Sequence, residues 1–291
     1  MGPAEPFFKR ISIIGLGLIG GSWALALKNL GHPAHRVGYD RPEVLSQALA
    51  SEAVNEAAKD LPSAVRNADL VILATPVGAI LDMLGQLQQH LSPRALVTDV
   101  GSTKRLICQR AKELISGKAV FLGGHPLAGK ENSGFTHADA TIFENVCYAL
   151  TPSSGEHMND GRAKAFVRLL ESLGARPYVT DAASHDLAVA YLSHLPQLLS
   201  SGLASMVADE LTEKRLPLEL AGTGFRDLTR LADSPYGLWR DICLTNIENI
   251  QSGIEAMIQK LESIKTHLSD RELERTFAEA RKLRDRLREQ S

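Results

Sequence analysis

A histidine enclosed by glycines and a proline is the residue of this chain best suited to acid–base chemistry. His125 lies in the segment Gly123–Gly134 (GGHPLAGKENSG), directly after the apolar run Ala119–Leu122, which predicts a buried strand. Ligands of open α/β sheets bind outside the carboxyl ends of the strands, so we expect His125 beside a ligand. Histidine titrates near neutral pH and is the most common general acid or base. The alternative is a buried histidine whose polar atoms are satisfied by its own turn.

A glycine-rich stretch near the start of the chain predicts a dinucleotide site. The segment Arg10–Ile14 is typical of a strand, and the segment Gly21–Leu30 is typical of a helix. Between them the spacing GxGxxG allows a tight turn, a close approach of the backbone to a pyrophosphate, and close packing of the helix on the strand. Free N–H groups at the helix N-terminus would then bind the phosphates. The residues that this motif assigns to the cofactor are Gly15, Gly17, Leu18, Ile19 and Gly20.

An acidic residue at the end of the next predicted strand favours NAD as the cofactor. Asp40 lies about 20 residues after the glycines, where a carboxylate accepts hydrogen bonds from the ribose hydroxyls. The same carboxylate would repel the 2′-phosphate of NADP. Arg41 follows and is able to pair with that phosphate, so NADP stays open as the alternative. Thr75 and Pro76, which end the apolar run Leu70–Ala74, are assigned to the cofactor site as well.

A serine occupies a comparable place after a further predicted strand. The segment Leu96–Asp99 is typical of a strand and Thr103–Ile115 of a helix, so Ser102 lies between them. This position puts the Ser102 hydroxyl at the sheet edge where we expect His125, and it suggests a catalytic role. The alternative is that Ser102 is the N-cap of the helix.

The order of the segments predicts the fold of the first half of the chain. Strands and helices alternate along residues 1–180, which is typical of a Rossmann-like α/β fold with a doubly wound parallel sheet. The later units of the series are the helix Val77–His90, the strand Val146–Leu150, a helix from about Asn159 to Leu173, and the strand Arg176–Val179. We therefore expect a dinucleotide-binding domain over residues 1–180.

From residue 181 onward the sequence shows helical periodicity without strands. Asp181–Leu211 has apolar residues at helical spacing, and Pro196 should kink this helix because proline removes a backbone donor. Pro235–His267 is expected as one long helix, and Asp270–Ser291 as a solvated, charged helix. The apolar stripes are too wide for one small helical domain to bury. We therefore expect residues 181–291 to form the all-α dimerisation and substrate domain of a homodimer.

Composition and charge exclude several classes of protein. The 291 residues carry a formal net charge of −2, which gives no electrostatic footprint for nucleic acid. Three widely separated cysteines form no CxxC pair, which indicates free thiols and neither disulfides nor metal ligands. No run approaches the ~20 apolar residues of a membrane span, and the N-terminus lacks the apolar core of a secretion signal. We expect a cytoplasmic protein that acts on a small molecule and binds neither nucleic acid nor membrane.

Six segments together resemble the prephenate/arogenate dehydrogenases, the cyclohexadienyl dehydrogenases of tyrosine biosynthesis. The segments around His125 and after Gly224 are specific to that family, and the six cover nearly the whole chain. They are GLGLIGGS (Gly15–Ser22), DVGSTK (Asp99–Lys104), GGHPLAGKENSG (Gly123–Gly134), HD (His185-Asp186), SHLP (Ser193–Pro196) and GFRDLTRLADSPYGLWRDI (Gly224–Ile242). The resemblance implies NAD-linked oxidative decarboxylation, in which hydride leaves the ring carbon that bears the hydroxyl and the ring carboxylate departs as CO₂.

The resemblance also implies roles for individual residues in the catalytic step. His125 would accept the proton of the ring hydroxyl, and Ser102 would hydrogen-bond the same hydroxyl and the histidine. Arg230 would hold a substrate carboxylate by paired hydrogen bonds, and Asp227, one turn earlier, would orient its guanidinium. Without the resemblance, a surface ion pair would be the simpler interpretation of Arg230 and Asp227.

Further positions are assigned to the substrate site by the same resemblance. Glu131 matches a position near the pocket entrance, and Trp239 matches a position near the partner subunit's active site. His185-Asp186 matches an ion-pair position, with a pair at a helix start as the alternative. His194 belongs to the SHLP segment, and Gln197 stands three residues later, where relatives often carry a histidine that contacts substrate. Because a glutamine cannot become cationic, our hypothesis is that arogenate is used at least comparably to prephenate.

Two other functions fit parts of the sequence. A β-hydroxyacid dehydrogenase also joins a dinucleotide fold to a helical domain, but no lysine that could serve as its catalytic group lies between Asp181 and Glu213. A NAD-sensing protein without turnover would have no need of His125, Ser102 and Arg230 together. Both alternatives therefore explain fewer of the residues than a dehydrogenase does.

Overall fold

The chain folds into two compact units that divide between Ile247 and Glu248. The computed structural model describes residues 7–115, 117, 119–129, 132–153 and 155–289. The first unit contains the sheet and the helices that pack on it, and the second consists of two long helices.

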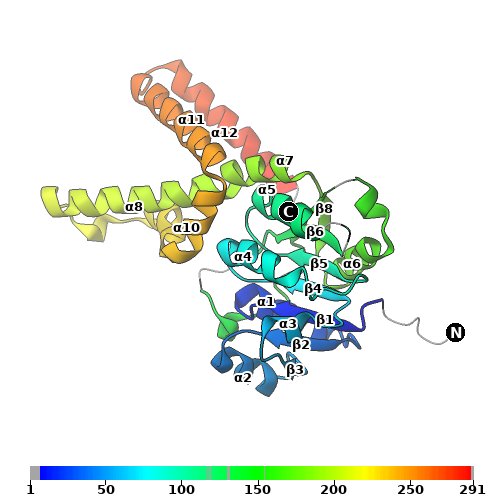
Figure 1. Ribbon diagram of the computed structural model, residues 1–291. Helices are drawn as coiled ribbons and strands as arrows, with labels where there is room; N and C mark the ends of the chain where they lie inside the picture. The colour runs from blue at the N-terminus through cyan, green and yellow to red at the C-terminus, as the bar shows by residue number, and fades with distance from the viewer. Residues whose placement is uncertain (1–6, 116, 118, 130–131, 154, 290–291) are drawn as a thin grey trace. The chain divides into compact units, whose positions relative to one another are not determined.

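An eight-stranded sheet forms the centre of the first unit (Figure 1). The strands lie in the order β3-β2-β1-β4-β5-β6-β7-β8, and β3 to β6 run parallel. The strand order reverses between β1 and β4, and this switch point opens a crevice at the carboxyl ends of the strands. The strands are β1 (Arg10–Ile14), β2 (His35–Tyr39), β3 (Glu56–Ala57), β4 (Leu70–Leu73), β5 (Leu96–Asp99), β6 (Val120–Pro126), β7 (Cys147–Pro152) and β8 (Arg176–Val179).

The Rossmann-like α/β fold expected from the sequence is confirmed, and two strands at one edge add a feature that the pattern did not predict. β7 pairs antiparallel with β6, and β8 pairs parallel with β7. A parallel return to the sheet needs a crossover of a dozen or more residues, usually a helix. In the described part of the β6–β7 connection, only the 3₁₀ turn η1 (Phe135–His137) is helical. The chain therefore returns in the opposite direction.

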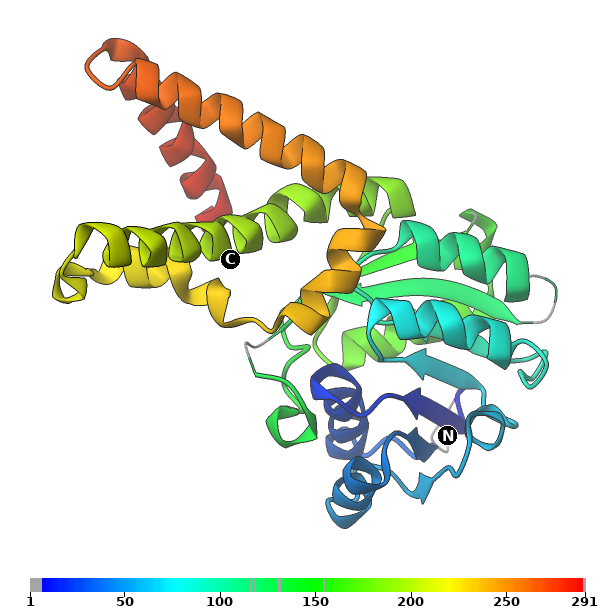
Figure 2. The same cartoon turned by 60° about the vertical axis from the view of Figure 1, so that its left-hand side comes forward.

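Helices cover both faces of the sheet and create two separate apolar cores (Figure 2). Ile13 points into the core beneath α1 and α6, whereas its neighbour Ile14 points into the core beneath α4 and α5, as alternation along a strand requires. Trp23, with Phe166 stacked on it at a centroid distance of 5.8 Å, lies at the centre of the first core. The helices of this half are α1 (Leu18–Asn29), α2 (Pro42–Ala50), α3 (Leu61–Val65), α4 (Val77–Leu87), α5 (Arg105–Ile115) and α6 (Gly161–Ser172).

The long helix expected over Asp181–Leu211 is present but interrupted. It consists of α7 (Ala182–Val189), a π-helical turn η3 (Ala190–His194) and α8 (Leu195–Lys214). Pro196 lies in the first turn of α8, where a missing backbone donor is tolerated. The change in hydrogen bonding therefore falls on the residues directly before the proline, and π-helical turns often mark functional sites.

The expectation of a single helix over Pro235–His267 is wrong. α10 (Tyr236–Thr245) ends before Asn246, whose φ of −131° and ψ of 29° leave the helical region, and α11 (Ile247–Thr266) follows. Asn246 is buried, and its side chain donates to the Asp186 carbonyl at 2.7 Å. A tertiary hydrogen bond therefore interrupts a sequence with continuous helical periodicity. The segment before α10 contains α9 (Thr223–Thr229) and the 3₁₀ turn η5 (Arg230–Asp233).

The second unit is formed by α11 and α12 (Arg271–Glu289). As expected for a charged helix, α12 carries ion pairs along its surface, including Arg288 with Asp285 at 3.1 Å. Several apolar side chains of the unit are exposed within one chain, among them Ile258, Leu261 and Phe277. None of the helices in the described ranges combines the length and the apolarity that a bilayer crossing requires.

Candidate active site

The loop between β1 and α1 requires glycine at two positions. Gly15 has a φ of +89°, and a Cβ there would lie 2.6 Å from the Ala74 carbonyl oxygen. A Cβ on Gly20 would lie 1.8 Å from the Gly15 carbonyl oxygen. Both neighbours are backbone atoms, so neither clash can be relieved by a side-chain rotation. The glycines thus allow a tight turn that packs against the end of β4.

Gly17 leaves open space at the N-terminus of α1. No atom lies within 4 Å of the place that a Cβ would take. Gly17 is the N-cap residue of α1, no described side chain caps this end, and the first turn, which begins with Leu18 and Ile19, holds no acidic residue. Free N–H groups and the positive end of the helix dipole favour an anion there. This end of α1 therefore fits the pyrophosphate of a dinucleotide.

Asp40 faces the same loop from the end of β2. Its carboxylate accepts hydrogen bonds from the backbone N–H groups of Leu16 at 2.6 Å and Arg41 at 2.7 Å. The carboxylate is thereby held beside the glycines, where it can also accept from ribose hydroxyls and would repel a 2′-phosphate. Arg41 extends into solvent, with 82% of its side chain exposed. The arrangement fits NAD better than NADP.

Thr75 and Pro76 border the glycine-rich loop at the end of β4. The Thr75 methyl carbon would lie 2.8 Å from a Cβ on Gly15, and Pro76 is the N-cap residue of α4. Both residues therefore lie beside the glycine-rich loop, and their contact with a cofactor stays a prediction.

His125 lies within β6 and not after it. The strand extends through Pro126, and His125 pairs with Ala149 of β7. The expectation that this strand ends at Leu122 is wrong, because the antiparallel partner continues the ladder past the glycines. The His125 side chain is 9% exposed. The sheet itself therefore holds this histidine in place.

Two histidines and an aspartate form a hydrogen-bonded chain that ends at His125. His125 Nδ1 lies 2.9 Å from His185 Nε2, and His185 Nδ1 lies 2.8 Å from a carboxylate oxygen of Asp186. All three side chains are buried. Burial lowers the pKa of His125 well below its usual value, and the nearby Lys104 ammonium acts in the same direction. His125 is therefore neutral at physiological pH and able to accept a proton.

A buried ion pair fixes the loop between β5 and α5. The ammonium of Lys104 pairs with Asp99, and both side chains are fully buried. Asp99 also accepts from the backbone N–H groups of Gly101 at 2.9 Å and Gly124 at 3.1 Å. The second of these bonds joins the loop to β6 next to His125. One carboxylate therefore positions both the loop and the strand that carries the histidine.

Ser102 does not cap α5, which was the alternative to a catalytic role. α5 begins at Arg105, and the backbone N–H groups of Lys104 and Arg105 donate to the two carboxylate oxygens of Asp186, at 2.6 and 2.9 Å. Ser102 is half-buried in the loop, and its hydroxyl forms no hydrogen bond with a described residue. Nothing in the described part of the fold therefore depends on this hydroxyl.

His194 and Trp239 each have one buried polar atom that forms no hydrogen bond with a described residue. These atoms are His194 Nε2 and the Trp239 indole nitrogen, and the two rings meet edge to face at a centroid distance of 5.9 Å within one chain. Asn246 Nδ2 lies 3.3 Å from His194 Nδ1, and an amide nitrogen only donates, so His194 Nε2 carries the hydrogen. Burial lowers the pKa of His194 to about 4. Buried donors without partners indicate a place for a ligand.

Gln197 connects α8 to the turn that carries Arg230. Its Nε2 donates to the Leu231 carbonyl at 2.7 Å and to the Ser201 hydroxyl at 3.3 Å, and the side chain is buried. Among the described residues, no group donates to its Oε1. Arg230 and Asp227 lie on exposed parts of η5 and α9. Gln197 therefore holds the start of η5, next to Arg230, against α8.

Three residues of the site were given no role from the sequence. Asp99 ends a predicted strand at the edge where His125 was expected, and that position was a usable signal. Lys104 and Asn246 both fall inside predicted helices, where the periodicity does not distinguish a buried polar residue from a solvated one. Glu131 lies outside the described residues, so its place near a pocket entrance stays a prediction.

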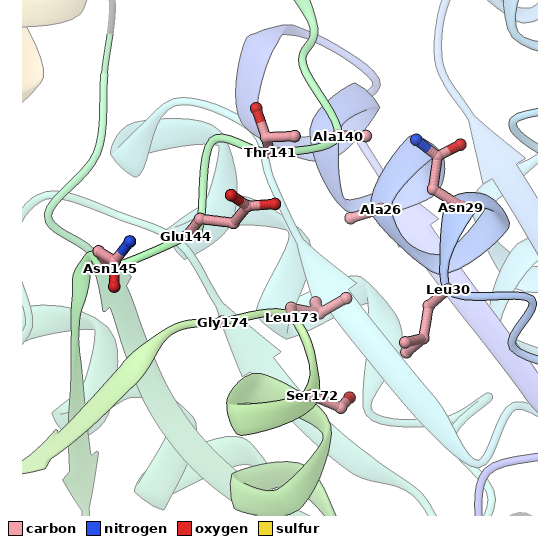
Figure 3. A pocket seen from close by; sticks show the side chains of 10 residues that line it. All are labelled: Ala26, Asn29, Leu30, Ala140, Thr141, Glu144, Asn145, Ser172, Leu173 and Gly174. Carbon is pink, nitrogen blue, oxygen red and sulfur yellow. The ribbon is translucent and has the colours of Figure 1, made fainter.

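A pocket of about 450 Å³ is lined by none of these residues (Figure 3). It lies between the ends of α1 and α6 and the loop before β7, where Asn29, Thr141, Glu144 and Ser172 border it. None of its lining side chains has a buried polar atom without a partner among the described residues. We therefore assign no ligand to it.

The fold and the site define a nicotinamide-dinucleotide oxidoreductase. A glycine-rich loop and Asp40 fit the cofactor at the switch point of the sheet, and a neutral buried histidine lies in the same sheet. Among known proteins, the family models "Prephenate dehydrogenase, nucleotide-binding domain" and "Prephenate dehydrogenase, dimerization domain" match residues 23–179 and 181–283. The chain belongs to the prephenate dehydrogenase family and is an NAD-dependent oxidoreductase of tyrosine biosynthesis.

Individual relatives cover nearly the whole chain. The prephenate dehydrogenase of Lactococcus lactis is 38% identical over 95% of this chain and 77% of its own. The crystal structure of Synechocystis arogenate dehydrogenase is 34% identical, with a TM-score of 0.79, and covers 96% of this chain and 99% of its own. The crystal structure of Aquifex aeolicus prephenate dehydrogenase, in complex with hydroxyphenyl propionate and NAD+, is 30% identical, with a TM-score of 0.82. It covers 96% of this chain and 97% of its own.

Proposed function

We propose that the chain oxidatively decarboxylates prephenate, arogenate or both, with His125 as the general base. The observation that carries this proposal is a buried, neutral histidine held by the sheet whose switch point fits NAD. Membership of the prephenate dehydrogenase family supports the same reaction.

The reaction balances with one proton held by His125. Its unprotonated ring nitrogen accepts the proton of the ring hydroxyl while hydride leaves the carbon that bears this oxygen. When bound, NAD supplies the acceptor of the hydride. The bond between ring and carboxylate then breaks, its electron pair enters the ring, and CO₂ leaves. The ring oxygen recovers the proton from His125, and the Ser102 hydroxyl aligns that oxygen with the histidine throughout.

Residues of the helical half hold the rest of the substrate. Arg230 binds a substrate carboxylate by two parallel hydrogen bonds, and Asp227 orients the guanidinium. The Nε2–H of His194 and the indole N–H of Trp239 donate to further substrate oxygens, which supplies the partners that the two buried atoms lack.

The orientation of Gln197 favours arogenate. Its Nε2 is occupied by the Leu231 carbonyl, so the atom left for a ligand is the acceptor Oε1. An acceptor suits the ammonium of arogenate, whereas the keto group of prephenate needs a donor. We therefore expect kcat/KM for arogenate to be at least comparable to that for prephenate.

Gln197→His tests this assignment directly. A histidine can donate to a keto group and, when protonated, repels an ammonium, so the ratio of the two kcat/KM values should move toward prephenate. Gln109→His, at an exposed position of α5, is the matched control and should leave the ratio unchanged. A wild-type preference for prephenate above ~100-fold, or about 2.7 kcal/mol, would contradict the assignment. An unchanged ratio in Gln197→His would contradict it as well.

The function itself is tested by mixing the protein with NAD and each candidate substrate. We expect the absorbance of NADH to rise with prephenate, arogenate or both, and CO₂ to form in equal amount. A 3-hydroxy acid serves as the comparison, because a β-hydroxyacid dehydrogenase would reduce NAD with it and release no CO₂. Turnover with the 3-hydroxy acid alone would refute the proposal.

The two halves of the chain divide this work. We assign dinucleotide binding to residues 1–180 and dimerisation with substrate binding to residues 181–291. The first family model matches residues 23–179, and the second, which is described as a dimerization domain, matches residues 181–283. Both matches support this division. The exposed apolar side chains of the helices support a homodimer.

A further inference from the structure

The contacts of His185 determine which nitrogen of each ring carries hydrogen. Both oxygens of the Asp186 carboxylate already accept backbone N–H groups, so in the 2.8 Å contact with Asp186 it is His185 Nδ1 that donates. In a neutral imidazole the other nitrogen is then an acceptor. His185 Nε2 therefore accepts a hydrogen from His125 Nδ1, 2.9 Å away. This leaves the lone pair of His125 on Nε2.

Only a cationic His185, with hydrogen on both nitrogens, would reverse this order. His185 is buried, and its two ring nitrogens already have one partner each in Asp186 and His125. The negative charge of Asp186 is already stabilised by two N–H groups at the start of α5 and by the positive end of that helix. A neutral His185 satisfies every hydrogen bond of the chain without a second buried cation.

The other titratable groups near His125 do not offer it a second carboxylate. They come from β5, the β5–α5 loop, α5 and η3, and are Asp99, Lys104, Cys108 and His194. Asp99 is engaged by Lys104 and by two backbone N–H groups. His194 is neutral because its pKa is about 4, and burial raises the pKa of the Cys108 thiol to about 11. Within the described residues, Asp186 is the carboxylate that His125 reaches through hydrogen bonds.

We infer that His185 and Asp186 are positioning residues of the reaction, which hold His125 in the tautomer whose Nε2 accepts the substrate proton. The inference rests on the proposed role of His125 as the base. When Nε2 takes the proton, His125 becomes a cation whose Nδ1–H stays bonded to His185. The Asp186 carboxylate, one ring away, stabilises that cation until the proton returns to the ring oxygen. The arrangement is that of a base oriented by a second group, extended by one imidazole.

The first test is spectroscopic and needs no turnover. Nitrogen NMR of histidine-labelled full-length protein, without substrate and near neutral pH, distinguishes a protonated ring nitrogen from an unprotonated one. We expect the wild-type His125 to carry hydrogen on Nδ1 and a lone pair on Nε2, and His185 to be neutral with hydrogen on Nδ1. A hydrogen on His125 Nε2, or a cationic His185, would overturn the inference even if the dehydrogenase activity is present.

The second test separates positioning from packing. His185→Phe keeps a buried ring but removes both nitrogens, so kcat should fall about 10²-fold while KM and NAD affinity stay within about threefold. His185→Gln retains one donor and one acceptor and should restore most of kcat. His90→Phe, at an exposed histidine after α4, is the control. Equal losses in folded His185→Phe and His185→Gln, or no loss in either, would refute positioning. If His185→Phe does not fold, the wild-type spectrum decides.

Discussion

Asp186, on α7, bonds to its neighbour His185 and to two distant parts of the chain, the start of α5 and Asn246, through its carboxylate and its own carbonyl group. The carboxylate accepts from the first N–H groups of α5 and from His185, and the carbonyl accepts from Asn246. Each of these donors is buried or partly buried, and an unsatisfied buried donor costs about 1–3 kcal/mol. Variants of Asp186 would therefore disturb folding and chemistry together, whereas His185 affects a single contact chain.

His125→Asn should leave the fold and NAD binding intact and reduce kcat by about 10²–10⁴-fold, because asparagine cannot accept the proton.

In the wild type, kcat/KM should stay constant as pH falls from about 8 to below about 6.5. The reason is that burial lowers the pKa of His125, so the neutral base persists. Steady-state kinetics over this pH range measures both effects, with His90→Asn as control. A kcat within about threefold of wild type in His125→Asn would exclude this base.

Asp40→Ser should reduce the preference for NAD over NADP. The substitution removes the repulsion of a 2′-phosphate and leaves Arg41 free to approach it, while serine can still bond one ribose hydroxyl. The measurement is the ratio of kcat/KM for the two cofactors. Asp82→Ser, on the exposed face of α4, should leave the ratio unchanged. A wild-type protein that prefers NADP would contradict the role of Asp40.

At the scale of elements, α10 joins the helical half to the ends of two sheet helices. Asp241 accepts a hydrogen bond from the Gly78 N–H at the start of α4, at 2.9 Å. The hydroxyl oxygens of Thr245 and of Thr103, which lies just before α5, are 2.8 Å apart and share a hydrogen bond. A Cβ on Gly78 would lie 2.7 Å from the Asp241 carboxylate, so the contact also requires glycine. Carboxylates at helix N-termini are stabilising, and this one comes from a distant part of the chain.

Asp241→Ala should lower the free energy of unfolding by about 1–2 kcal/mol, because it removes the acceptor of a partly buried helix N–H. Urea denaturation at a fixed protein concentration measures the change. Asp82→Ala, on the exposed face of the same helix, is the matched control and should stay within about 0.5 kcal/mol of wild type. Equal stability of the two variants would show that α10 docks without this bond.

An element could be predicted from the sequence when the interactions that define it join residues close together in the chain. The strands and the glycine-rich turn depend on local patterns, so β1, β5 and β8 were expected at their observed bounds. The break at Asn246 depends on a hydrogen bond to Asp186, 60 residues away, and no local pattern carries it. The direction of β7 and the chain from His125 to Asp186 likewise arise from pairings between distant segments. The candidate residues were thus predictable by type, but their hydrogen bonds were not.

At the scale of the whole molecule, the exposed apolar surface of the helical half predicts an obligate homodimer. Leu192 is 79% exposed and Leu220 is 80% exposed within one chain, and further apolar side chains of α8 to α11 are also exposed. Exposed patches of this kind mark interfaces. Sedimentation should therefore give a dimer at micromolar concentration. A stable, active monomer would refute this prediction.

Because His125 lies in a strand paired with β7, the residue that we propose for the chemistry belongs to the hydrogen-bonded sheet. The residues that we propose for substrate recognition, Gln197, Arg230 and Trp239, all lie on helices of the other half. A substitution among the latter can change which acid is bound without moving the base. Such a separation makes the scaffold adaptable: substrate preference can change through substitutions on the helices while the strand that carries the base stays the same.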